Sequence, residues 1–213
     1  RGLGDVYKRQ LKYNGVVYNE MKGAFSSPDE VLEREIMNHL FPDTTYGCES
    51  GGDPKNIPDL TYENFLNFHR TYYHPSNSYI YLYGNMDMEE KLAFLDEHYL
   101  SHFDYLDVDS VIQEQKAFGA CQDVTLEYPV AENEGEEDNT YLSYNMVVGN
   151  AADSQMAMAF EVLDYALLSA PGAPLKQALL DVKAGKDVYG SYDDGILQPY
   201  FTVIAKGSNP VSY

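Results

Sequence analysis

The fold class of this chain is decided by residues 140–168, TYLSYNMVVGNAADSQMAMAFEVLDYALL. Residues 140–148 predict a strand, and Asp153 can then cap a helix that extends to about Leu168. The apolar residues of this helix recur on one face, namely Met156, Phe160, Leu163 and Leu167. Across the chain, helices and strands are segregated into runs, and several strand pairs look like hairpins. This pattern favours an α+β fold over a doubly wound parallel sheet.

The same half of the chain contains the partners of this strand and helix. An acidic turn is expected between the strand that precedes residue 131 and the strand that begins at residue 140. Pro174 suits the start of a shorter helix, which Gly185 ends. The remaining elements expected here are strands at residues 123–128, 187–192 and 200–206.

The first half of the chain is mainly helical in pattern. Ser27 and Glu30 form a capping box around Pro28, which suits the first position of a helix. Glycines and prolines interrupt residues 43–60, so this stretch predicts an ordered loop. Residues 78–83 alternate aliphatic and tyrosine side chains, which predicts a strand. Helices are expected at residues 15–25, 28–40, 61–73 and 88–100.

The pattern weakens around residues 104–118, and a similar order of elements then begins again. We therefore expect two consecutive α+β lobes with mainly antiparallel sheets, at residues 11–105 and 119–209, joined by a linker at 106–118. Residues 1–10 and 210–213 resemble translated sequencing-adapter sequence and are left out of the fold prediction. The expectation is then that the chain is an internal piece of a longer protein and that its first lobe is truncated.

Composition excludes several classes of function. The 213 residues are 44% hydrophobic, which is enough for a globular core, and their net charge of −20 opposes binding to nucleic acid. No apolar run approaches the roughly 20 residues that cross a bilayer, so no membrane partner is expected. Cys48 and Cys121 are too few for a disulfide framework or a thiolate zinc site. A reducing compartment, the cytoplasm, is therefore the expected location.

The histidines are the first candidates for metal ligands. His98 and His102 stand four residues apart on an expected helix, a spacing that can place two imidazoles on one metal. No acidic residue lies between them, and a solvated helix end, where the helix dipole favours histidine, explains them more simply. His69 and His74 are five residues apart across a helix end, and a structural role is favoured for them as well.

Two further motifs have structural explanations. Residues 50–54, SGGDP, lack the lysine and the helix start of a phosphate-binding loop and are expected to form a tight turn. The acidic cluster does not alternate as calcium ligands do and predicts a solvated hairpin tip; it comprises Glu132, Glu134, Glu136, Glu137 and Asp138. Without a nucleophile elbow or a cofactor fingerprint, residue patterns alone indicate only an acidic α+β protein.

The segment at residues 15–23, GVVYNEMKG, resembles the third-ligand helix of the pitrilysin/insulinase family of zinc peptidases, in its presequence protease branch. The resemblance continues in the same order through most of the chain. The other similar segments are LFPDTTYG at 40–47, SGGDP at 50–54, IPDLT at 57–61, FHRTYYHPSN at 68–77, LDYALL at 163–168, PL at 174–175 and LQP at 197–199.

Membership in this family implies a zinc-dependent peptidase whose two halves enclose a chamber and degrade short unfolded peptides. In such enzymes an inverted H-x-x-E-H helix supplies two zinc ligands and the glutamate that activates water, and a distal glutamate completes the ligand set. Glu20 matches that distal glutamate. The alternative for Glu20 is an ordinary surface glutamate near the N-terminus.

The sequence departs from the family pattern because it contains no H-x-x-E-H. Two zinc ligands and the general base are then absent, so this chain by itself is expected to be catalytically inactive and to retain no zinc. Its expected partners are peptide substrates and the remaining domains of the parent chain. Two alternatives remain: a non-catalytic scaffold of the same family, and an acidic module that captures cationic peptides.

Overall fold

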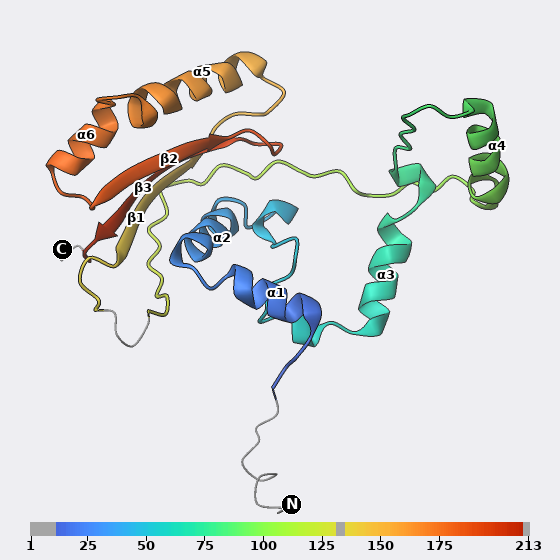
Figure 1. Cartoon of the computed structure of the whole chain (residues 1–213), viewed down its shortest axis with the longest axis horizontal. Helices are drawn as coiled ribbons and strands as arrows, with labels where there is room; N and C mark the ends of the chain where they lie inside the picture. Colours follow the sequence, from blue (N-terminus) through green and yellow to red (C-terminus); the bar gives the residue numbers. More distant parts are fainter. Residues whose placement is uncertain (1–11, 131–134, 211–213) are drawn as a thin grey trace, which may run out of the picture. The chain divides into compact units, whose positions relative to one another are not determined.

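The computed structural model describes residues 12–130 and 135–210, and it divides the chain into two compact units (Figure 1). The larger unit combines the chain up to Asp53 with the chain from Ile112 onward. The smaller unit is Pro54–Val111. This grouping by contact differs from the expected lobes at residues 11–105 and 119–209, whose limits stay a prediction.

A three-stranded antiparallel sheet forms the centre of the larger unit. Its strands are β1 (Thr140–Val147), β2 (Asp187–Asp193) and β3 (Tyr200–Ser208), in the order β1-β3-β2. β3 is central and is the most buried strand. All three were predicted from the sequence within two residues, and the α+β class with an antiparallel sheet is confirmed.

One face of the sheet is covered by α5 (Ser154–Asp164) and α6 (Pro174–Asp181), which lie along it in Figure 1. Between them the backbone forms a π-helical turn, Tyr165–Ser169, so the helix expected to reach Leu168 changes its hydrogen bonding after Asp164. The buried core beneath these helices contains Val148, Leu168, Val188, Phe201 and Ala205.

The opposite face of the sheet contacts α2 (Pro28–Leu40), which follows α1 (Val16–Ala24). Ile36 and Phe41 pack against Tyr200 and Ile204 of β3. Because alternate residues of a strand point to opposite faces, β3 contributes to both cores. Residues 28–41 therefore pack with the sheet, although the sequence pattern had assigned them to the other lobe.

The smaller unit contains α3 (Tyr62–Tyr72) and α4 (Met88–His98), with short 3₁₀ helices at Ile57–Asp59, Pro75–Asn77 and Leu100–His102. No residue of Pro54–Val111 is buried. The strand predicted at residues 78–83 is wrong: no described strand pairs with it, and the side chains of Tyr79 and Tyr81 are almost fully exposed. Alternation indicates a face suited to a sheet, but a strand also needs a hydrogen-bonding neighbour.

The strand predicted at residues 123–128 is also absent. The segment nevertheless approaches β1, because the ring of Tyr128 packs edge-on against Tyr141 at a centroid distance of 5.9 Å. The turn between residues 131 and 134 lies outside the described residues. The structure thus contains only one strand of the expected hairpin.

Candidate functional site

Glu20, the predicted metal ligand, lies on α1 with an exposed side chain. The helix begins after Gly15, whose backbone is extended, and no residue of α1 is buried. Among the described residues Glu20 takes part in no ion pair. Its carboxylate is therefore accessible. This position fits both interpretations of Glu20, as a metal ligand and as an ordinary surface glutamate.

The described residues do not form a complete metal centre. Within residues 12–130 and 135–210, no group of three His, Cys, Asp or Glu side chains is placed to hold an ion. One carboxylate is too few for zinc, which takes three or four protein ligands. The residues present therefore do not fit a bound zinc by themselves.

The histidine pairs occupy structural positions. The helix α4 ends at His98, and His102 lies in the separate 3₁₀ turn, so the two no longer share one helical face. The ring of His98 packs on Phe94 with centroids 4.5 Å apart. His74 accepts a hydrogen bond from the backbone N–H of Ser76 at 3.2 Å and thereby caps the following turn.

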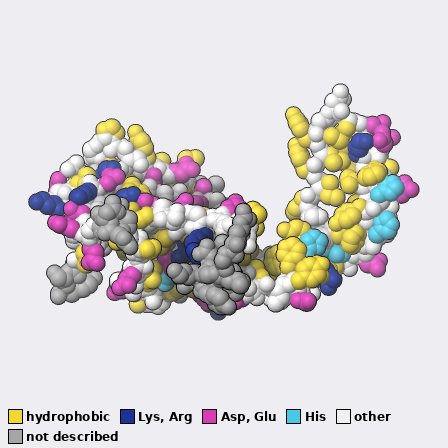
Figure 2. Space-filling model, turned by 60° about the horizontal axis from the view of Figure 1, so that its bottom comes forward, with side chains coloured by type: hydrophobic (Ala, Val, Ile, Leu, Met, Phe, Trp, Pro, Cys, Tyr) yellow, Lys and Arg dark blue, Asp and Glu magenta, His cyan; other side chains and the backbone are white. Residues whose placement is uncertain are grey.

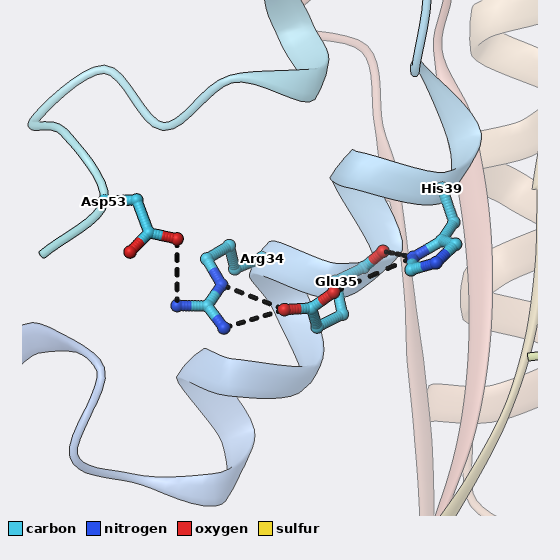
Figure 3. Close-up of polar contacts among 4 residues, drawn as sticks. All are labelled: Arg34, Glu35, His39 and Asp53. Atoms are coloured by element: carbon cyan, nitrogen blue, oxygen red, sulfur yellow. Dashed lines mark hydrogen bonds and ion pairs between the residues drawn. The ribbon is translucent and has the colours of Figure 1, made fainter. Parts of the chain in front are cut away.

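A polar cluster around Arg34 holds α2 next to the loop that follows it (Figure 3). Arg34 donates to Glu35 Oε1 from Nε at 3.2 Å and from Nη2 at 2.7 Å, and its Nη1 lies 3.9 Å from Asp53 Oδ2. His39 Nδ1 lies 2.7 Å from the backbone carbonyl of Glu35. Asp53 belongs to the SGGDP segment, so this segment serves as a structural turn that meets Arg34.

The joint between α1 and α2 borders a cavity of about 460 Å³. The guanidinium of Arg34 lies over the ring of Phe25 at 4.5 Å, a cation–π contact that closes one side of the cavity. Met21 and Cys48 also line it, whereas Glu20 does not. Among its lining residues, no nucleophile is hydrogen-bonded to a base.

Asp29 forms the second polar cluster, between α2 and the sheet. Its Oδ2 accepts from Lys206 Nζ at 2.7 Å and from the Tyr141 hydroxyl at 3.3 Å, and its Oδ1 accepts from the Tyr189 hydroxyl at 2.9 Å. The hydrogen bond from Lys206 holds the pKa of Asp29 below its usual value and raises the pKa of Lys206 above its own. Burial, with Asp29 nearby, raises the pKa of Tyr189.

Gln115 connects the chain segment that precedes the sheet to the loops that contain Asp43 and Gln198. It is a buried polar residue whose Oε1 accepts from the Asp43 N–H at 2.9 Å and whose Nε2 donates to Asp43 Oδ2 at 2.8 Å. Gln198 Oε1 accepts a hydrogen bond from the backbone N–H of Gln115. Gln198 Nε2 donates to the backbone carbonyl of Gln115 at 3.2 Å. No sequence pattern predicted these pairings, because the partners lie 72 and 83 residues apart.

At the acidic tip, Glu132 and Glu134 lie outside the described residues. Asp138 forms an ion pair with Lys186 at 2.8 Å and accepts from Asn209 Nδ2 at 2.8 Å. Glu136 and Glu137 are exposed. For this described part, the expected solvated tip agrees with the structure.

In the described parts of the chain, no helix is both long enough and apolar enough to cross a bilayer. The surface view in Figure 2 shows acidic groups spread among apolar patches. Apolar side chains are prominent over the smaller unit, where Phe65, Tyr79 and Tyr81 are exposed.

Comparisons with known proteins identify relatives over most of the chain. Residues 59–212 match the family model described as the peptidase M16 inactive domain. The protein HypA of Clostridium perfringens is 51% identical over 199 residues, which cover 93% of this chain and 20% of that protein. Presequence protease 1, chloroplastic/mitochondrial, of Arabidopsis thaliana is 39% identical over 201 residues, or 92% of this chain and 18% of that protein.

A solved structure supports the fold. A protein described as an M16-like peptidase from Alicyclobacillus acidocaldarius aligns with a TM-score of 0.52 at 18% identity, covering 91% of this chain and 46% of that chain. At this identity the likeness concerns the fold alone. The chain spans about a fifth of the length of the curated relatives it matches.

Proposed function

This chain belongs to the M16 peptidase family, and from that premise we propose that it forms part of a zinc-dependent metalloendopeptidase that degrades short unfolded peptides. The observation that carries the proposal is the order of two features. The helix with Glu20 precedes residues 59–212, which match the inactive-type domain of the family. A helix that resembles the third-ligand motif, followed by an inactive-type domain, supports the proposal of a two-lobed peptidase.

The relatives support peptide cleavage as the activity of the longer protein. Several of them carry the name presequence protease, including proteins of Arabidopsis thaliana and Xenopus laevis. Because the chain spans about a fifth of their length, the rest of such a protein supplies most of the chamber. Unfolded peptides are the proposed substrates, and the other domains of the longer protein are the proposed partners.

The proposed role of Glu20 is that of the distal zinc ligand. Its exposed carboxylate on a helix could contribute one oxygen to a metal whose other ligands come from an H-x-x-E-H helix elsewhere in the longer protein. The 213-residue chain contains no such helix, so the chain alone is proposed to be inactive and to bind zinc only weakly.

The experiment is a Glu20→Gln substitution in the longer protein, with zinc content and cleavage of an unstructured fluorogenic peptide as readouts. The substitution removes the negative charge but keeps the shape, so both zinc content and activity should fall by a large factor. Glu161→Gln is the matched control, because Glu161 is an exposed helical glutamate on α5. Unchanged zinc content in the Glu20→Gln protein contradicts the assignment.

The isolated chain provides a second test. After dialysis it should hold no stoichiometric zinc and should not cleave the same peptide, because water attack needs both a metal with an open site and a base. Stoichiometric zinc that is lost when His98 and His102 become alanine would reveal a different metal site and would contradict this proposal.

A second candidate is a non-catalytic scaffold of the same family, to which the match with an inactive-type domain applies equally. The sequence of the longer protein distinguishes the two, because a peptidase requires H-x-x-E-H and a scaffold does not. The third alternative is an acidic module that binds cationic peptides. It predicts tight binding of such peptides to this chain and loss of that binding when salt is added.

A cytoplasmic location also stays a prediction, and the presequence protease names place those relatives in mitochondria or chloroplasts.

A further inference from the structure

The carboxylate of Asp29 connects α2 to every strand of the described sheet. It accepts hydrogen bonds from Tyr141 of β1, Tyr189 of β2 and Lys206 of β3, at 3.3, 2.9 and 2.7 Å. Lys206 Nζ also lies 5.3 Å from the centre of the Tyr141 ring, so two of the three donors contact each other through a cation–π interaction. Asp29 stands in the first turn of α2, where the helix dipole favours a negative charge.

This contact joins two different parts of the family architecture. The match to the inactive-type domain begins at residue 59, so α1 and α2 lie outside it, whereas β1, β2 and β3 lie inside it. The apolar residues Ile36 and Phe41 pack on the same face of the sheet. Apolar burial is not directional, whereas three hydrogen bonds to one carboxylate favour one orientation of α2 on the sheet.

The orientation of α2 determines that of α1 because the joint between them is short and stiff. Only residues 25–27 separate the two helices. Ser26 donates to the Gly23 carbonyl from its backbone N–H at 3.1 Å and from its hydroxyl at 2.6 Å. The Phe25 ring packs under the Arg34 guanidinium at 4.5 Å. A rotation of α2 on the sheet would therefore move α1 with it.

We propose that Asp29 is a positioning residue that latches α2 to the sheet of the inactive-type domain and thereby orients α1, the helix that carries Glu20. The part that concerns Glu20 rests on the proposed function. The latch itself needs no metal and can be tested on this chain alone.

The first experiment measures amide hydrogen exchange in Asp29→Asn. The substitution removes the charge that Lys206 and the two hydroxyls recognise, so peptides covering residues 16–40 should exchange about ten-fold faster, while the β3 peptide is unchanged. Asp138→Asn is the matched control, because Asp138 pairs with Lys186 on the same domain and likewise accepts a second hydrogen bond. Equal exchange of residues 16–40 in Asp29→Asn and the wild type, or equal loosening in both variants, overturns the latch.

A double-mutant cycle separates a specific latch from a general loss of stability. Lys206→Met removes the cation, so if the two residues act through one contact, Asp29→Asn combined with Lys206→Met should loosen residues 16–40 little more than the more severe single variant does. A double variant that is as loose as the sum of the single variants contradicts a contact between the two residues.

The second experiment links the latch to Glu20 in the longer protein by measuring zinc affinity. Asp29→Asn should weaken zinc binding about ten-fold, with Glu20→Gln as the reference for loss of the ligand. If Glu20→Gln changes nothing, the proposed function fails, while the exchange experiment still decides the latch. If Glu20→Gln removes zinc but Asp29→Asn leaves the affinity unchanged, the positioning role is overturned.

Discussion

Replacing Phe41 with alanine should release α2 from the sheet. Phe41 is fully buried at the end of α2, where the edges of the Tyr46 and Tyr200 rings meet it at centroid distances of 5.9 and 6.2 Å. It is the largest fully buried side chain in the cluster that includes Ile36 and Ile204.

The magnitude follows from burial and from the two aromatic pairs. Truncating a buried phenylalanine to alanine typically costs about 3–5 kcal/mol, which includes the cavity left behind. With the two lost edge-to-face pairs included, Phe41→Ala should cost about 4 kcal/mol, the middle of that range. Phe41→Leu keeps most of the volume and should cost only about 1.5 kcal/mol.

Urea unfolding followed by circular dichroism measures these differences. With a slope of about 2 kcal/mol per molar urea, the Phe41→Ala midpoint should fall by about 2 M. Phe65→Ala is the control, because Phe65 lies on α3 and is 68% exposed, and it should change stability by less than about 0.5 kcal/mol. A loss below about 1 kcal/mol in Phe41→Ala would show that α2 does not pack on the sheet.

Further predictions concern pH and two glycines. The pKa of Asp29 is lowered in the fold, so ionised Asp29 stabilises the fold above the unfolded pKa of about 3.9, and this contribution is lost as the pH falls through the folded pKa. Asp29→Asn should therefore make the free energy of unfolding fall less steeply with decreasing pH in the acid range. Burial and the neighbouring Asp193 raise the pKa of Tyr200, so its contribution is present below about pH 10 and is lost as the pH rises, and Tyr200→Phe should make the same free energy fall less steeply with increasing pH in the alkaline range. Gly190→Ala should cost about 1–3 kcal/mol in thermal or urea unfolding, because an added Cβ would lie 2.6 Å from Leu168 Cδ1 and even closer to a β3 carbonyl. Gly23→Ala should instead stabilise by about 0.5–1 kcal/mol, because the position is helical and open, and a destabilised Gly23→Ala protein would contradict the helical assignment.

Local signals predicted the helices well. Ser27, Thr61, Asp87 and Asp153 each cap a helix by accepting the backbone N–H three residues ahead. Such a bond depends only on residues within one turn, so the sequence contains all the information that it needs. The strands β1, β2 and β3 were also predicted, and their sheet supplies the neighbours that strands require.

The sequence patterns did not predict contacts between residues far apart in the chain. Residues 78–83 have the alternation of a strand but no neighbour among the described residues, so the pattern did not decide the structure. Arg34 was not singled out, because its partner Asp53 lies in a loop whose path no local rule specifies. Gln115 was missed for the same reason.

For the candidate site, the sequence by itself determined the family and the glutamate that matches its third-ligand motif, because short motifs in a constant order are a property of the chain alone. Only the tertiary structure decided which surface α2 covers and what holds it there. Asp29 meets Tyr141, Tyr189 and Lys206 across 112, 160 and 177 residues of chain. The assembled sheet brings these three donors together. The spacing of residues along the chain therefore does not predict their hydrogen bonds to Asp29.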